Sequence, residues 1–176
     1  TGIFTRYNNG WQIIIRNTDD LSPSVLSIFK EAFDEIQGDF TTENIKLAEG
    51  VSYAWKWASA AYGMKASGYV NGANVELQSR LKSPAINLSS VKSATLKFDQ
   101  AINFSSDMTK ECKVQVSTNG KIWTDLDVKG YPNKNGWDFV TCTADLTKYC
   151  GKTIYIGFLY SSSTSAAPTW EVKNFM

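Results

Sequence analysis

The feature that most constrains the fold is a succession of short apolar runs, each ended by turn-forming residues. Within residues 112–116, apolar and polar side chains alternate with a period of two, and Ala94, Leu96 and Phe98 share the same spacing. This period places one face of a strand in a core and the other in water. Further short runs occupy residues 51–57, 62–66, 74–78, 137–142, 153–160 and 170–175. The pattern predicts an all-β fold, a sandwich of two antiparallel sheets.

Helical periodicity is weak throughout, although residues 24–35 could form a turn or two of helix. Near the start, the runs 2–7 and 11–16 flank Asn8-Asn9-Gly10, and an Asn-Gly pair between such runs favours a β-hairpin. A lone hairpin is marginal in water and must lean on something else. We therefore expect residues 1–22 to be a hairpin left from a preceding domain, and residues 27–176 to be the sandwich domain.

Composition excludes several classes of function. The chain has 18 Lys and Arg against 17 Asp and Glu, without a run of like charge, so it has no electrostatic footprint for nucleic acid or an anionic membrane. It has no histidine, which excludes a Ser-His-Asp triad and a histidine zinc site. No apolar stretch reaches the ~18 residues that a membrane-spanning helix needs. Oligomeric state is not readable from these features.

Three cysteines, Cys112, Cys142 and Cys150, cannot all pair within the chain. Cys142 and Cys150 could form a disulfide if their strands are neighbours. The alternative is that all three are small buried apolar side chains.

Five stretches follow one another along the chain: Phe29-Lys-Glu-Ala-Phe33, Leu81-Lys-Ser-Pro-Ala-Ile-Asn-Leu88, Ala94-Thr-Leu-Lys-Phe-Asp99, Val114-Gln-Val-Ser-Thr-Asn-Gly120 with Trp123, and Thr169-Trp-Glu-Val-Lys-Asn-Phe175. In order and spacing, over about 150 residues, they resemble the jelly-roll modules called choice-of-anchor J or cleaved-adhesin-like domains, which have a galactose-binding-like fold.

The resemblance implies a jelly-roll sandwich in an exported, extracytoplasmic bacterial protein, at the cell surface or outer membrane. Carbohydrate binding or adhesion, with a glycan or a surface protein as partner, is the usual function for such a fold. The hairpin before Asp20 similarly resembles the end of the OB-like domain that precedes these modules in bacteroidete lipoproteins. Because a fold does not fix a function, these implications are expectations.

Many modules of this fold hold a structural calcium where the first and last strands meet. The acidic residues in matching places are Glu31, Asp34, Asp99 and Glu171. The family often has an Asp where this chain has Lys173, and an ammonium repels a cation. Two expectations follow: either calcium is bound, or Lys173 takes its place and pairs with Glu31 or Glu171.

A sugar site needs an open aromatic face flanked by hydrogen-bonding groups. Trp55 and Trp57 are two apart and share a strand face, and we expect at least one of them to be a core residue. Residues 131–137 form a predicted loop, where aromatic side chains are better placed for a ligand, although turn chemistry alone also explains its Asn and Gly. Other aromatic and amide groups are Tyr53, Tyr62, Tyr69, Asn71 and Asn74. The predicted ligand-binding residues are Trp55, Tyr131, Asn133, Asn135 and Trp137.

Catalysis has little support. Asp125 and Asp127 could share a strand face as a carboxylate pair, but solvated surface acids are the simpler interpretation. The sequence therefore favours a non-catalytic binding module. A structural spacer is the alternative, and a carboxylate-dependent glycoside hydrolase is the weakest candidate.

Overall fold

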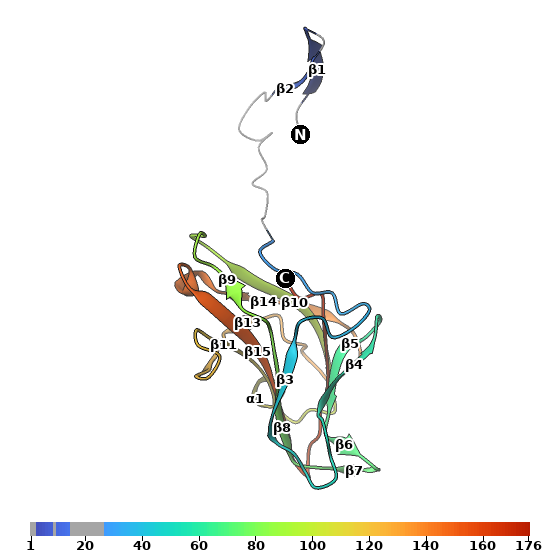
Figure 1. The fold of residues 1–176 in the computed structure, drawn as a ribbon. Coiled ribbons are helices and arrows are strands. Elements are labelled where there is room, and N and C mark those ends of the chain that lie inside the picture. Colours follow the sequence, from blue (N-terminus) through green and yellow to red (C-terminus); the bar gives the residue numbers. More distant parts are fainter. Residues whose placement is uncertain (1–2, 9, 15–26) are drawn as a thin grey trace.

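The computed structural model describes residues 3–8, 10–14 and 27–176. Two large antiparallel sheets lie face to face, which confirms the predicted jelly-roll sandwich (Figure 1). Sheet I has the strand order β13-β14-β10-β16-β5-β4. Its strands are β4 (Trp55–Ser59), β5 (Gly63–Ser67), β10 (Thr95–Asn103), β13 (Val128–Lys129), β14 (Val140–Asp145) and β16 (Thr169–Lys173).

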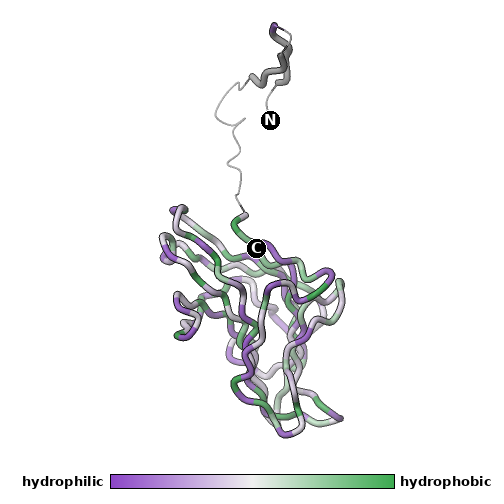
Figure 2. The backbone as a smooth tube through the Cα atoms, viewed as in Figure 1, coloured by the Kyte–Doolittle hydropathy of each residue, from purple (hydrophilic) through white to green (hydrophobic). Residues whose placement is uncertain are grey.

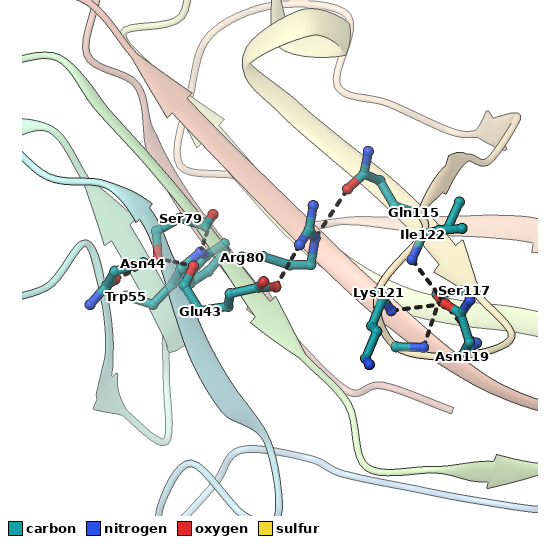
Figure 3. A network of polar contacts seen from close by, with 11 residues as sticks. Glu43, Asn44, Trp55, Ser79, Arg80, Gln115, Ser117, Asn119, Lys121 and Ile122 are labelled. Atoms are coloured by element: carbon teal, nitrogen blue, oxygen red, sulfur yellow. Dashed lines mark hydrogen bonds and ion pairs between the residues drawn. The ribbon is translucent and has the colours of Figure 1, made fainter.

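Sheet II has the order β12-β11-β15-β8-β3, and β9 also pairs with β15. Its strands are β3 (Thr41–Lys46), β8 (Leu77–Lys82), β9 (Ile86–Asn87), β11 (Cys112–Ser117), β12 (Thr124–Asp125) and β15 (Thr153–Ser162). Its outer face, the one turned away from sheet I, carries a polar row across several strands. There Arg80 donates to Glu43 (2.6 Å) and to Gln115 (3.2 Å), as Figure 3 shows.

Two small hairpins lie outside these sheets, β1 (Ile3–Tyr7) with β2 (Gly10–Ile14) and β6 (Tyr69–Val70) with β7 (Ala73–Asn74). The first confirms the predicted N-terminal hairpin, since Tyr7 pairs with Gly10 across the turn. The division into domains at residues 22 and 27 stays a prediction, and residues 15–22 lie outside the described part of the chain. Helical structure among the described residues is limited to α1 (Met108–Glu111) and the 3-10 turn η2 (Thr147–Tyr149).

The core forms where the inner faces of the two sheets meet. Alternation along β15 sends Ile154, Ile156, Phe158 and Tyr160 inward. Figure 2 shows hydrophobic and hydrophilic residues interspersed along the backbone of the sandwich. Trp170 of β16 fills the centre of the core, where its indole N–H donates to the side-chain oxygen of Gln100 at 2.7 Å. The buried polar atoms of this pair are therefore satisfied, as burial requires.

The opening segment, residues 29–33, is not a regular strand. It makes a single bridge, between Glu31 and Phe175, rather than a ladder. The backbone turns at Phe33, whose φ of +59° is incompatible with an extended strand. The helical alternative is also wrong for residues 27–35, while residues 24–26 lie outside the described residues.

Candidate ligand-binding pocket

Trp55, one of the predicted ligand-binding residues, is a core residue. Only 3% of its surface is exposed, and its indole N–H donates to the carbonyl oxygen of Ser79 at 3.2 Å. Its ring lies against Trp170, with 5.3 Å between the centroids. Trp57 is the exposed member of the pair. Trp55 therefore presents no ring face to a ligand at the surface, because its ring is part of the core on the inner side of sheet I.

The predicted loop residues have separate roles. The Tyr131 hydroxyl donates to the carbonyl oxygen of Cys112 at 2.6 Å, which anchors the loop. Asn135 accepts from the amide of Ser105 (2.8 Å) and donates to its carbonyl oxygen (2.9 Å). Asn133 is exposed. Only Trp137 presents an open ring among these loop residues.

Trp137 packs edge-on against Phe104, and 51% and 63% of these side chains are exposed. Phe104 has a φ of +61°, an unusual conformation for a bulky residue. The Asn135 amide holds the neighbouring Ser105 and so helps to fix this turn. Sequence reasoning found Trp137 and missed Phe104, since Asn103-Phe104-Ser105 reads only as the end of a strand.

A better enclosed site lies on the outer face of sheet I. We call it the Tyr53–Tyr69 pocket, and its volume of about 390 Å³ falls in the range of about 300–1,000 Å³ that small-molecule sites occupy. Its lining comes from the loop leading into β4, from β4 itself, from the second half of β5, and from β6 with the turn that follows it. The lining residues are 50–54, Lys56, Lys65, Ser67 and 69–71.

The floor of the pocket follows from strand alternation. In β4 and β5, Trp55, Met64 and Ala66 point into the core, so Lys56 and Lys65 lie on the outer face. These two lysines are direct partners in the β4–β5 ladder. The sheet therefore places two ammonium-bearing side chains side by side beneath the opening.

The wall of the pocket is the β6–β7 hairpin, turned by Asn71 and Gly72, both at positive φ. Gly68 precedes it and lies so close to sheet II that an added Cβ would be 2.2 Å from Ser162 Oγ. The hydroxyl of Ser162 accepts from Leu77 N (3.2 Å) and donates to Val75 O (2.8 Å), which fixes the base of the hairpin. Because Gly68 has no Cβ, the β6–β7 hairpin can lie this close to sheet II.

Two partly exposed tyrosines line the pocket. Tyr53 is 50% exposed and Tyr69 is 60% exposed. The Lys56 ammonium lies 5.8 Å from the centroid of the Tyr53 ring, within the range of a cation–π contact. Sequence reasoning grouped both tyrosines among possible sugar contacts but gave the loop at 131–137 preference. Nothing local in the sequence reveals that a residue before β4 meets a hairpin after β5.

Glu171 lies next to the floor of the pocket. It pairs with Lys65 across the β16–β5 ladder, yet only 3% of its surface is exposed and its Oε2 has no hydrogen-bond partner. Burial raises the pKa of this carboxyl, and the nearby ammonium groups of Lys65 and Lys173 oppose the shift. Glu171 is therefore a buried acid beside the pocket, rather than an exposed ligand.

The expected calcium ligands do not gather. The described residues contain no group of three or more Asp, Glu or Cys side chains that could hold a metal ion. Asp99 accepts from Thr141 (2.6 Å) and Asn174 (2.7 Å), and Glu31 accepts from the amide of Phe33 (2.9 Å). Asp34 is exposed, while Glu171 is buried. These residues do not fit a calcium site.

Lys173 does not form the expected ion pair either. Its ammonium donates to the carbonyl oxygen of Ala61 at 2.9 Å and lies 4.1 Å from the centroid of the Phe139 ring. Within residues 27–176 it makes no ion pair with Glu31 or Glu171 inside 4.0 Å. The hypothesis of a Lys173 pair with either glutamate is therefore wrong, because a carbonyl oxygen and an aromatic face satisfy the ammonium instead.

The carboxylate pair considered for hydrolysis is engaged by lysines. Asp125 accepts from Lys113 and Gln115, both at 2.7 Å, and Asp127 accepts from Lys129 at 2.6 Å. The hydrogen bond from Lys113 lowers the pKa of Asp125. A general acid in glycoside hydrolysis needs a raised pKa, so this carboxyl is poorly suited to that role.

No protein-family model and no curated protein matches the chain. Among solved structures, the K3 cleaved adhesin domain of Lys-gingipain from Porphyromonas gingivalis superposes with a TM-score of 0.56 at 16% identity, covering 85% of this chain and 98% of that one. The K1 domain of the same protein gives 0.52 at 15% identity, covering 84% and 96%. A family 29 carbohydrate binding module gives only 0.37 at 16% identity, covering 77% and 86%. The chain therefore has the fold of the cleaved adhesin domains. No helix among the described residues is long and apolar enough to cross a membrane.

Proposed function

We propose that residues 27–176 form a non-catalytic carbohydrate-binding module of an exported bacterial surface protein. The observation that carries the proposal is the Tyr53–Tyr69 pocket, where two half-open tyrosine rings stand over a floor of hydrogen-bonding side chains. The shared fold with adhesin domains is consistent with a binding role but assigns no ligand. The choice-of-anchor J assignment and the lipoprotein context belong to the same proposal.

The chemistry of the pocket suits a sugar. A pyranose presents an apolar face of C–H groups that packs on an aromatic ring, and its hydroxyl edge needs donors and acceptors. Tyr53 and Tyr69 supply rings, while Ser52, Ser67 and Asn71 supply polar groups. Tyrosine rings have only two side-chain torsions to order, so holding a ligand costs them little conformational entropy.

Two alternatives are weaker. A hydrolase would need a carboxyl with a raised pKa opposite a second acid, and Asp125 has a lowered pKa and lies against Lys113. A pure spacer would have no need of open aromatic rings around a pocket. Single exposed aromatic residues are ordinary, but two that flank one hollow favour binding.

A glycan array probed with the full chain tests the proposal. We expect binding to a subset of glycans, and the double variant Tyr53→Ala/Tyr69→Ala should weaken it by tenfold or more, which corresponds to about 1.4 kcal/mol. The matched comparison is Phe104→Ala/Trp137→Ala, which removes the other exposed aromatic pair. Loss of binding only in that second variant would move the site to the 131–137 loop. A wild-type chain that binds no glycan would leave the spacer as the better account.

A further inference from the structure

We infer that the ligand of the Tyr53–Tyr69 pocket is an acidic glycan, whose sugar rings carry a carboxylate or a sulfate. This inference rests on the function proposed above and narrows it to a ligand class. The observation behind it is the pair of lysines that sheet I places side by side in the floor of the pocket.

The lysine pair is unfavourable on its own. Lys56 and Lys65 are directly opposite each other on one face of an antiparallel pair, where like charges repel. Among the described residues neither lysine forms an ion pair within 4.0 Å, so no carboxylate of residues 27–176 directly neutralises either ammonium group. An anion bound between the two ammonium groups would remove this repulsion.

The nearby charges leave the pocket positive. Across sheet I, Glu171 is the partner of Lys65, and Asp99 is the partner of Lys173. Each carboxylate is thus the ladder neighbour of a lysine, without an ion pair inside 4.0 Å among the described residues. Lys56 has no acidic partner in its ladder, and the neighbour of its ammonium is the uncharged ring of Tyr53. The ammonium and the ring together form a surface for a sugar ring that bears a negative charge.

The remaining lining groups agree with a sugar acid rather than with a simple anion. The pocket, at about 390 Å³, is far larger than a bare phosphate or sulfate needs, and two tyrosines line it. Its other polar side chains, Ser52, Ser67 and Asn71, are uncharged and match hydroxyl groups. An ammonium gains most from a charged acceptor, because charge-assisted hydrogen bonds are about twice as strong as neutral ones.

Matched pairs of polysaccharides test the inference. Galacturonan and its methyl ester share one backbone and differ in charge, and carrageenan and its desulfated form do the same for sulfate. In calorimetric titrations of the full chain we expect an acidic member to bind on the order of tenfold or more tighter than its neutral partner. Which pair shows the difference identifies carboxylate or sulfate as the recognised group.

Charge-removal variants then locate the effect. Lys56→Gln should lose the preference for the acidic member, whereas Lys152→Gln, which removes an exposed lysine outside the pocket, should keep it. Equal affinity for charged and neutral members, with binding still abolished by Tyr53→Ala/Tyr69→Ala, would overturn the acidic ligand and leave the glycan module standing. If Lys56→Gln and Lys152→Gln lose the preference equally, the preference does not come from the pocket but from the charge of the whole surface, and the inference is overturned. Absence of binding to any glycan would remove the proposed function itself.

Discussion

The guanidinium carbon of Arg80 lies 4.4 Å from the centroid of the Trp123 ring, and the two side chains meet above Gly157. An added Cβ at Gly157 would be 2.6 Å from Arg80 Cδ and 2.8 Å from Trp123 Cζ3. The glycine thus leaves a hollow in the middle of β15, and the stacked pair fills it. The same guanidinium binds Glu43 and Gln115 (Figure 3), so one side chain ties together β3, β8 and β11.

Arg80→Lys should therefore destabilise the domain despite keeping the charge. A lysine cannot stack as a plane or hold Glu43 and Gln115 together, and we expect a loss of about 1–3 kcal/mol in the free energy of unfolding. Urea denaturation of Arg80→Lys, Trp123→Leu and the double variant measures the coupling. Strictly additive losses would show that the stacking contributes nothing.

The sequence predicts the strands and the turn of this region, but not the contact between Trp123 and Gly157. The pair Asn119-Gly120 is typical of a turn, and in the structure Ser117 Oγ accepts from the amides of Asn119 and Gly120 at 3.3 and 2.9 Å. The strand pattern also gave the sandwich, because period-two alternation is local. The position of Trp123 over Gly157 depends on pairing between strands that are far apart in the chain. A local sequence pattern holds no information on such pairing.

The same limit explains why the sequence did not reveal the edge strand β3 or the surroundings of three aromatic side chains. All six residues of β3 are exposed, so no apolar alternation marks it. Trp55 and Trp57 are two apart, yet Trp55 packs against Trp170 in the core, whereas Trp57 is more exposed and its indole N–H donates to the carbonyl oxygen of Phe33 at 2.8 Å. The loop tyrosine, Tyr131, looked free and is anchored to Cys112. In each case tertiary pairing decided what spacing left open.

Gly63→Ala should cost far more stability than an alanine at a comparable glycine. Gly63 has a φ of +66°, and an added Cβ would lie 2.3 Å from the carbonyl oxygen of Val172. Gly151 has a φ of +82° with nothing within 4 Å, so Gly151→Ala should cost only the backbone strain, about 1–2 kcal/mol. Thermal and urea unfolding of the two variants give the comparison. Equal losses would mean that β5 shifts freely away from β16.

Glu171→Gln should stabilise the protein at neutral pH. Burial raises the pKa of Glu171, so the folded state holds this proton more tightly than the unfolded state does. Stability from that proton is present at low pH and is lost as the pH rises, which makes the ionised carboxylate a cost at pH 7. The melting temperature of Glu171→Gln should exceed that of the wild type at pH 7, with the gap closing toward acidic pH. Glu35→Gln, at an exposed position, is the control, and a gap independent of pH would contradict the assignment.

The thiols should differ sharply in reactivity. The structure has three free cysteines, of which Cys112 and Cys142 are buried and Cys150 is partly exposed. Burial raises the pKa of Cys112 and raises that of Cys142 to about 11, so both stay protonated at pH 8. Iodoacetamide should add one label to the native protein, at Cys150, and three after denaturation. A Cys142–Cys150 disulfide would instead block Cys150 and lower the intact mass by two hydrogens.

Calcium should leave the melting temperature unchanged. The carboxylate of Asp99 already accepts hydrogen bonds from Thr141 and Asn174, and its ladder partner is Lys173. An incoming cation would have to displace these donors beside an ammonium group. Thermal unfolding with millimolar calcium and with a chelator makes the comparison. A rise of several degrees with calcium alone would restore the metal site that the family resemblance implies.

The wall of the Tyr53–Tyr69 pocket can change independently of its floor. The β6–β7 hairpin projects from one end of the sandwich (Figure 1). Its two strands pair only with each other and not with a strand of either large sheet. Residues inserted at the tip of such a hairpin are tolerated because little of the core depends on them. Selectivity in this scaffold can thus diversify by lengthening or grafting one small hairpin, while the lysine floor and the folded sandwich are inherited unchanged.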